Sequence, residues 1–252
     1  MMPRSRPWLV PDRRSDPELM DAPGLPADEV ADAYAVLRRV NRHLGNNRVI
    51  DREVRRFRAE DPIGPAASVL DVGSGSGDVP RRMARLLDRL GSGRVVPIAL
   101  DRDPVATMIA GSSASEGVPV HVVRGDALNL PFPDRSVDLV TAVKFAHHFE
   151  GEALARLLSE MARVSRCRVV VLDIRRHWLA YAGFVAWSRV FTRNRLVRLD
   201  GPLSVLRGFT DEELAGLAAP LGEFYWTVQR DLGFQISLIG KRKNSSQKLT
   251  SR

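Results

Sequence analysis

The stretch VLDVGSGSGDVP, residues 69–80, places three glycines in five positions directly after a run of β-forming residues. A glycine-rich turn between a buried strand and a helix lets a ligand approach the main chain, and it directs the helix N-terminus at that ligand. The spacing Gly73-x-Gly75-x-Gly77 differs from the G-x-G-x-x-G pattern of dinucleotide-binding folds, and the chain holds no P-loop pattern. The stretch therefore predicts a ligand site at the end of a strand.

The segments around this stretch alternate between strand and helix patterns. Continuous apolar strands separated by amphipathic helices indicate a parallel sheet that is buried on both faces. We therefore expect an α/β fold with a doubly wound sheet. The expected strands are 68–73, 94–101, 118–126, 136–144 and 167–174, followed by two strands within 223–242, and the expected helices between them are 78–90, 103–114 and 150–164. A further helix, 210–221, begins with the capping pattern of Thr210 and Glu213.

The domain organisation follows from shifts in composition. Residues 1–27 are rich in proline and charge and are expected to be flexible, whereas 28–60 carry helical apolar spacing and are expected to form a helical cap. The ligand-binding domain is expected to span 61–240, including an insertion at 175–209 that contains an aromatic helix and an arginine-rich loop. Residues 241–252 carry no acid and are expected to be a disordered basic tail.

Composition narrows the class of protein. The 252 residues hold 38 Lys and Arg against 30 Asp and Glu, a net charge of +8, which raises the question of a nucleic-acid partner. Much of that excess lies in the tail and in the arginine-rich part of the insertion, so we expect no nucleic acid. The single cysteine allows no internal disulfide and no cysteine-based metal site, so we expect a cytoplasmic protein without a metal. The longest apolar run, 178–187, is too short to cross a bilayer.

Four segments in order resemble the class I S-adenosylmethionine-dependent methyltransferases, a family with a seven-stranded, mostly parallel, Rossmann-like sheet. They are VLDVGSGSG, IALDRDP, VVRGDALNLPFPDRSVDLV and VTAVKFAHHF, and the resemblance runs from about residue 68 to 174. It implies S-adenosylmethionine as the cofactor. The predicted cofactor-binding residues are Asp71, Gly73, Ser74, Gly75, Gly77, Asp101, Arg102, Asp126, Ala127 and Lys144, of which Lys144 departs from the family's pattern.

The resemblance also implies roles for some of these residues. Asp71 would lie near the methionine amino group, the glycines would make room for the cofactor, and Asp101 would accept both ribose hydroxyls. Asp126 would face the exocyclic amine of adenine, with Ala127 supplying main chain. For each acid, a structural role is the alternative to cofactor binding. Asp71 would then be a solvated or capping carboxylate, Asp101 the N-cap of the next helix, and Asp126 a turn residue. Lys144 either binds an acidic group of the substrate or extends to solvent.

His147 and His148 are the candidate catalytic residues. Methyl transfer to an oxygen acceptor requires removal of a proton, and a histidine titrates in the range that suits a general base. Adjacent residues point in different directions, so one of the two is expected to face the site. The alternative is that a histidine here packs beneath the cofactor without titrating.

The aromatic helix of the insertion points to a hydrophobic acceptor. Aromatic side chains recur every three or four residues, so most of its circumference is apolar, and it must pack against the cap, a hydrophobic substrate or a membrane surface. Together with VNRHLG, residues 40–45, the insertion resembles methyltransferases encoded beside bacterial polyketide synthases. We therefore expect O-methylation of a small phenolic or polyketide-derived acceptor; the oligomeric state stays open. Alternatives are a quinone-type C-methyltransferase, a nucleic-acid methyltransferase, an oxidoreductase and a cofactor-binding protein without activity.

Overall fold

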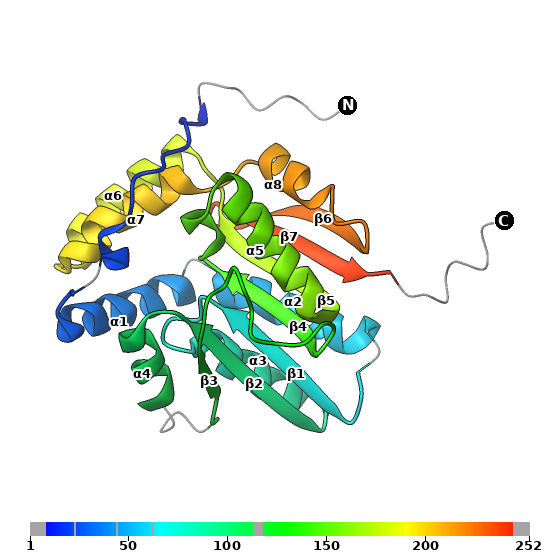
Figure 1. Ribbon diagram of the computed structural model, residues 1–252. Coiled ribbons are helices and arrows are strands. Elements are labelled where there is room, and N and C mark those ends of the chain that lie inside the picture. The colour runs from blue at the N-terminus through cyan, green and yellow to red at the C-terminus, as the bar shows by residue number, and fades with distance from the viewer. Residues whose placement is uncertain (1–8, 23, 44, 62, 113–117, 244–252) are drawn as a thin grey trace.

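Seven strands form one sheet in the order β3-β2-β1-β4-β5-β7-β6, which confirms the expected doubly wound α/β fold (Figure 1). The first five strands run parallel, and β7 pairs antiparallel with both β5 and β6. The computed structural model describes residues 9–22, 24–43, 45–61, 63–112 and 118–243. The strands are β1 (Ala66–Val72), β2 (Arg94–Asp101), β3 (His121–Arg124), β4 (Val137–Val143), β5 (Ser165–Ile174), β6 (Phe224–Asp231) and β7 (Gln235–Arg242).

The helices follow the predicted order, with one correction. They are α1 (Ala27–His43), α2 (Asn46–Glu60), α3 (Asp78–Arg89), α4 (Pro104–Ser112), α5 (Gly151–Val164), α6 (Trp178–Phe191), α7 (Arg195–Arg207) and α8 (Asp211–Ala218). The prediction of an arginine-rich loop after the aromatic helix is wrong, because the chain forms α7 there. Asn194 caps this helix by accepting the N–H of Val197, and Leu196, Val197 and Val205 are buried.

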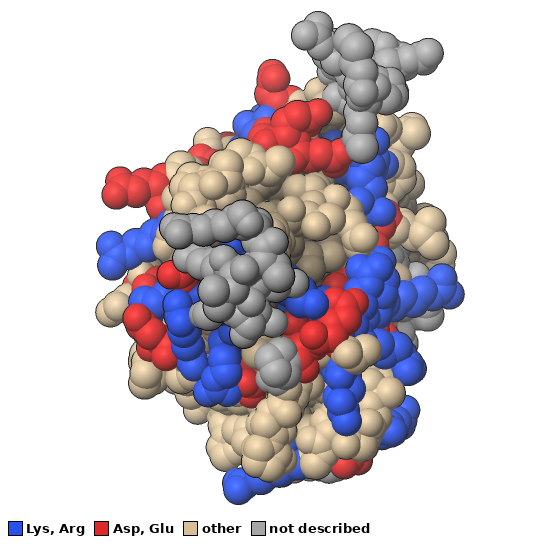
Figure 2. Space-filling model, turned by 90° about the vertical axis from the view of Figure 1, so that its right-hand side faces the viewer, with Lys and Arg blue, Asp and Glu red and all other residues tan. Residues whose placement is uncertain are grey.

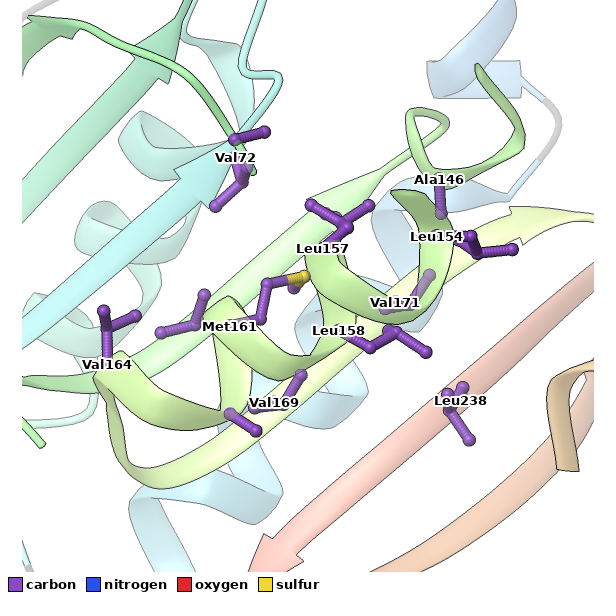
Figure 3. Packing of buried hydrophobic residues seen from close by; sticks show 14 of the residues in the cluster. Val72, Ala146, Leu154, Leu157, Leu158, Met161, Val164, Val169, Val171 and Leu238 are labelled. Carbon is purple, nitrogen blue, oxygen red and sulfur yellow. The ribbon is translucent and has the colours of Figure 1, made fainter. Parts of the chain in front are cut away.

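The helices cover both faces of the sheet because successive strand residues point to opposite faces. On β5, Val169 and Val171 join the cluster beneath α5 and α8, whereas Val170 and Leu172 join the cluster beneath α2 and α3. Figure 3 shows the first cluster, in which the apolar side of α5 lies over β5. This explains why the strands read as continuous apolar runs in the sequence.

We expect Leu157→Ala to lower the free energy of unfolding by about 2–5 kcal/mol, since it leaves a cavity in the cluster shown in Figure 3. Leu157 is fully buried on α5. The matched control is Leu232→Ala, the same change at a side chain 79% exposed, with an expected effect within about 0.5 kcal/mol. Urea unfolding measures both values, and similar losses in the two variants would contradict the packing described above.

A separate apolar cluster joins the N-terminal part of the chain to the insertion. Val30 and Ala33 of α1 pack against Leu196 and Val197 of α7. The described residues before α1 run beside α7 (Figure 1), where the Asp200 carboxylate accepts the N–H groups of Leu19 and Met20 at 2.8 and 2.9 Å. We call residues 9–22 the N-terminal segment. Of residues 1–27, which are expected from the sequence to be flexible, 1–8 and 23 lie outside the described residues. So do Leu44 in the expected helical cap and most of the basic tail, 244–252, although β7 itself extends to Arg242.

Charged side chains of both signs cover the surface. On the face in Figure 2, Lys and Arg are interspersed with Asp and Glu, as is typical of a solvated surface rather than of a single basic patch. Among the described residues, no helix is long and apolar enough to cross a membrane.

The strand order reverses between β1 and β4, because β2 and β3 lie on one side of β1 and the later strands on the other. In open α/β sheets, ligands bind outside the carboxyl ends of the strands at such a reversal. The glycine turn follows β1 and the two candidate histidines follow β4, so the topology brings both to this edge.

Candidate active site

The glycine turn is fastened to the end of the neighbouring strand. The N–H groups of Gly73 and Ser74 donate to the carbonyl of Leu100 on β2 at 2.9 and 3.0 Å. Gly73, Gly75 and Gly77 have φ values of 69°, 53° and 73°, a region that side chains disfavour.

Space also requires glycine at two of these positions. A Cβ on Gly73 would lie 2.2 Å from the Phe145 ring, and a Cβ on Gly75 would lie 2.8 Å from the Tyr34 ring. Phe145 precedes the histidine pair and Tyr34 belongs to α1. The turn is therefore a bare stretch of main chain that aromatic side chains cover from two sides.

Asp71 lies at the carboxyl end of β1 with 1% of its surface exposed. The hydroxyl of Thr141 on β4 donates to its carboxylate at 2.6 Å. Burial raises the pKa of Asp71 to about 7, although hydrogen bonds to the carboxylate act in the opposite direction. The site thus holds a buried acid that ionises near neutrality.

This shift predicts a pH dependence of stability. The pKa of Asp71 is about 7 in the folded chain against 3.8 in the unfolded one, so the folded state binds the proton more tightly. The resulting stabilisation is complete below about pH 4 and is lost as the pH rises to 7, by about 4 kcal/mol in total. Urea unfolding between pH 4.5 and 8 should show this loss relative to Asp71→Asn, which cannot ionise. A constant difference between the two proteins across this range would contradict the assignment.

Asp101 ends β2 and links two loops at the same edge. Its carboxylate accepts the N–H of Gly75 at 2.8 Å and the N–H of Asp103 at 3.0 Å, and burial raises its pKa. The N-cap of α4 is Asp103 rather than Asp101, because Asp103 accepts the N–H groups of Val105 and Ala106. The capping alternative for Asp101 is therefore wrong, and the carboxylate supports the glycine turn.

The remaining predicted cofactor residues lie at different depths. Asp126 is exposed and accepts the N–H of Leu128 at 2.9 Å, which is the turn role that the sequence left open, while Ala127 beside it is buried. Arg102 is exposed, with its guanidinium 3.7 Å from Asp21. The residues around the glycine turn thus form the interior of the site, and Arg102 and Asp126 lie at its rim.

Lys144 directly follows β4 in a left-handed conformation, with φ of 55°. Burial lowers the pKa of its ammonium to about 8, against the effect of the Asp173 and Asp231 carboxylates. The side chain of Lys144 is half-buried at this edge of the sheet.

His147 is held between carboxylates and is 3% exposed. Its Nδ1 lies 2.7 Å from Asp173 Oδ1, and its main-chain N–H donates to the other oxygen of Asp173 at 3.1 Å. Its Nε2 faces Glu18 at 3.4 Å. Burial alone would lower the pKa of His147, but the carboxylates outweigh it and raise the pKa to about 9.

His148 is the more accessible histidine of the pair, with 21% of its side chain exposed. Its Nδ1 lies 2.9 Å from Asp21 Oδ2, and its Nε2 lies 3.8 Å from Glu18. The Arg207 guanidinium donates to the main-chain carbonyls of both histidines, which fixes their backbone against α7. The structure therefore brings both predicted catalytic histidines to the same edge as the glycine turn.

Sequence reasoning did not identify Glu18, Asp21 or Asp173 as part of this site. The first two lie in the N-terminal segment, more than a hundred residues from the histidines, and no motif marks them. Asp173 lies near the end of β5, the strand beside β4, so its position next to His147 follows only from the strand order.

Known proteins share this fold and part of this sequence. Residues 69–168 match the family described as Methyltransferase domain. The 2-phytyl-1,4-naphtoquinone methyltransferase of Synechococcus elongatus is 31% identical over 117 residues, which are 44% of this chain and 48% of that protein. The same values hold for the enzyme of that name from a second Synechococcus strain. The chain thus spans about half the length of the curated relatives it matches.

Solved structures resemble nearly the whole chain. A putative S-adenosylmethionine-dependent methyltransferase of Methanococcus maripaludis superposes with a TM-score of 0.60 at 14% identity, over 92% of this chain and 98% of that one. The magnesium protoporphyrin IX methyltransferase of Synechocystis, solved with bound S-adenosylhomocysteine, gives a TM-score of 0.55 at 16% identity, over 79% and 84%. The chain has the fold of the class I S-adenosylmethionine-dependent methyltransferases.

Proposed function

We propose that this protein transfers the methyl group of S-adenosylmethionine to a hydroxyl of a small hydrophobic, phenolic or polyketide-derived acceptor. The observation that carries the proposal is the convergence of the glycine turn, the buried Asp71 and Asp101, and the histidine pair at the reversal of strand order. The family match to residues 69–168 supports the same reaction class.

The residues at this edge fit the cofactor. The side chains that lie against the bare main chain of Gly73 and Gly75 are the rings of Phe145 and Tyr34, which would move aside for the cofactor. Asp71 would hold the amino group of the methionine part. Each oxygen of Asp101 has a second lone pair beyond its present hydrogen bond, so the carboxylate would still accept two ribose hydroxyls. When bound, the cofactor supplies a methyl group already activated on a sulfonium.

The proposed cofactor contacts extend to residues around these two acids. Ala127 would provide main chain beside the adenine and Asp126 would accept its amine. Ser74, Gly77, Arg102 and Lys144 complete the predicted set around the turn and its rim. Each of these proposed contacts is supported by the position of the residue at the edge of the sheet where the parallel strands have their carboxyl ends.

His148 is the better candidate for the general base. It is more exposed than His147, and the Asp21 carboxylate at Nδ1 would keep the proton on that nitrogen, leaving Nε2 to accept a proton from the acceptor hydroxyl. His147 is a positioning residue in this proposal, since Asp173 and Glu18 hold its ring from both sides.

The aromatic helix supports a hydrophobic acceptor. Phe184 and Trp187 of α6 pack against the cluster of α1 and α7, whereas Trp178 and Phe191 are 45% and 71% exposed. The helix thus divides its aromatic side chains between the cap and the surface. Exposed apolar side chains of this size can contact a hydrophobic acceptor or the lipid around it.

C-methylation of a quinone-like ring is the second candidate function. It is favoured by the 31% identity to naphtoquinone methyltransferases over 117 residues. Both reactions use the same cofactor site. They differ in the product, because O-methylation gives an ether and C-methylation gives a new carbon–carbon bond on the ring.

Calorimetric titration with S-adenosylhomocysteine, with NAD as the control, tests the cofactor site. Micromolar binding of the former alone is the expected result. Phenols, resorcinols and quinols are then offered with labelled S-adenosylmethionine, and the products are identified by mass and NMR. Binding without transfer to any acceptor would favour a non-catalytic cofactor-binding protein, and binding to NAD alone would overturn the proposal.

A further inference from the structure

Glu18, His147 and His148 converge on one point next to Phe145, whose ring lies over the glycine turn. One ligand atom from each lies within 4.8 Å of those of the other two. We propose that these three side chains bind a divalent transition-metal ion and that Zn²⁺ fits them best. The first ligand comes from the N-terminal segment and the other two follow β4, so the ion would join the segment to the sheet edge.

The distances suit ligands of one ion better than hydrogen bonds. Nε2 of His147 and of His148 lie 3.4 and 3.8 Å from the two oxygens of Glu18, beyond the usual range of a hydrogen bond. A tetrahedral zinc site with bonds of about 2.0–2.1 Å separates its ligand atoms by about 3.3 Å. Nε2 of His147 is buried and makes no hydrogen bond among the described residues, and the group that it faces is Glu18, the first of the proposed ligands.

Each proposed ligand is oriented by a hydrogen bond on its far side. Asp173 lies 2.7 Å from Nδ1 of His147, and Asp21 lies 2.9 Å from Nδ1 of His148. The hydroxyl of Ser204 donates to Glu18 Oε1 at 2.8 Å. Histidines that bind metals almost always donate their other N–H to a carboxylate or carbonyl, and ligating carboxylates are themselves hydrogen-bonded. All three ligands here show that arrangement.

The donor set selects the kind of ion. Two imidazole nitrogens and one carboxylate suit zinc and its transition-metal neighbours, whereas Mg²⁺ and Ca²⁺ prefer oxygen ligands alone. Three protein ligands leave a fourth position for an exchangeable group. With Nε2 of His148 bound to the ion, that nitrogen would no longer act as a general base. An acceptor hydroxyl at the fourth position would instead release its proton to solvent more readily, because a bound metal lowers the pKa of its ligand. This consequence rests on the proposed function, whereas the metal site itself does not.

The test is calorimetric titration of the full chain, first stripped with EDTA, with Zn²⁺ and separately with Mg²⁺. We expect one Zn²⁺ per chain at micromolar or tighter affinity and no Mg²⁺ binding of that strength. Glu18→Gln and His148→Ala should each weaken Zn²⁺ binding at least tenfold, and Asp21→Asn should weaken it about 10–100-fold through the orientation of His148. Circular dichroism of each variant checks that it is folded.

His121→Ala is the matched control, since His121 is an exposed histidine on β3, outside the proposed site, and its loss should leave the affinity unchanged. Co²⁺ provides a second readout, because the visible absorption of a tetrahedral complex should appear in the wild type and vanish in His148→Ala. Absence of Zn²⁺ binding, or binding that Glu18→Gln and His148→Ala leave intact, would overturn the site and leave the cluster as an ion pair. Neither outcome depends on methyl transfer or on S-adenosylhomocysteine binding.

Discussion

Asp101→Ala is expected to weaken S-adenosylhomocysteine binding by about 10²- to 10⁴-fold. The carboxylate would accept two ribose hydroxyls, and each hydrogen bond to a charged group contributes roughly 1.5–3 kcal/mol. The same carboxylate holds the N–H of Gly75 at 2.8 Å, so its loss also frees the glycine turn. Asp101→Asn retains one acceptor oxygen and should fall between Asp101→Ala and the wild type.

Asp103→Asn is the matched control for this prediction. It removes one negative charge two residues away, at a side chain that caps α4 through Val105 and Ala106. We expect a loss of about 1 kcal/mol or less in stability and an unchanged affinity. Calorimetry measures the affinities, with thermal unfolding as the check on folding. Equal losses of affinity in the Asp101 and Asp103 variants would mean that the loss of negative charge alone causes the effect. An unchanged affinity in Asp101→Ala would contradict the proposal that the cofactor binds at this edge of the sheet.

The parallel part of the fold could be predicted from the sequence because its signals are local. β1, β2, β4 and β5 are largely apolar runs of 7 to 10 residues, and their alternation with helices restricts the topology. The region after β5 was less predictable. The arginine-rich sequence of α7 resembles that of a loop, and its helix buries Leu196 and Val197 against Val30 and Ala33 of α1, a tertiary contact that no local pattern shows.

The candidate site also combines residues that local motifs locate with residues that only tertiary contacts bring together. The glycine turn, Asp71 and Asp101 occupy fixed places at strand ends, so the motif and the topology together locate them. Glu18 and Asp21 could not be found, because their role depends on how the N-terminal segment lies against α7. An acid in a proline-rich segment looks solvated in the sequence, and only tertiary contacts show that Glu18 is 6% exposed.

His147 and His148 differ in what their removal would disturb. Truncating His147 would remove the ring that pairs with Asp173, a carboxylate with no exposed surface, so His147→Ala is expected to lower stability by about 3–5 kcal/mol. A fall in its activity would therefore mix folding with chemistry. His148 has Asp21 as its partner at the surface of the site, so its truncation should leave the fold intact.

We expect His148→Ala to lower kcat by about 10²- to 10⁴-fold while leaving the S-adenosylhomocysteine affinity unchanged, since a positioned general base contributes about that much. Single-turnover transfer from labelled S-adenosylmethionine to the accepted phenol measures the rate, with His121→Ala as the control. Added imidazole should restore part of the activity, because it can occupy the space that the ring leaves. A normal rate in His148→Ala would exclude His148 as the general base, whereas the Zn²⁺ titration decides separately whether it is a metal ligand. A slow rate together with unchanged Zn²⁺ affinity would assign the proton transfer to the imidazole itself.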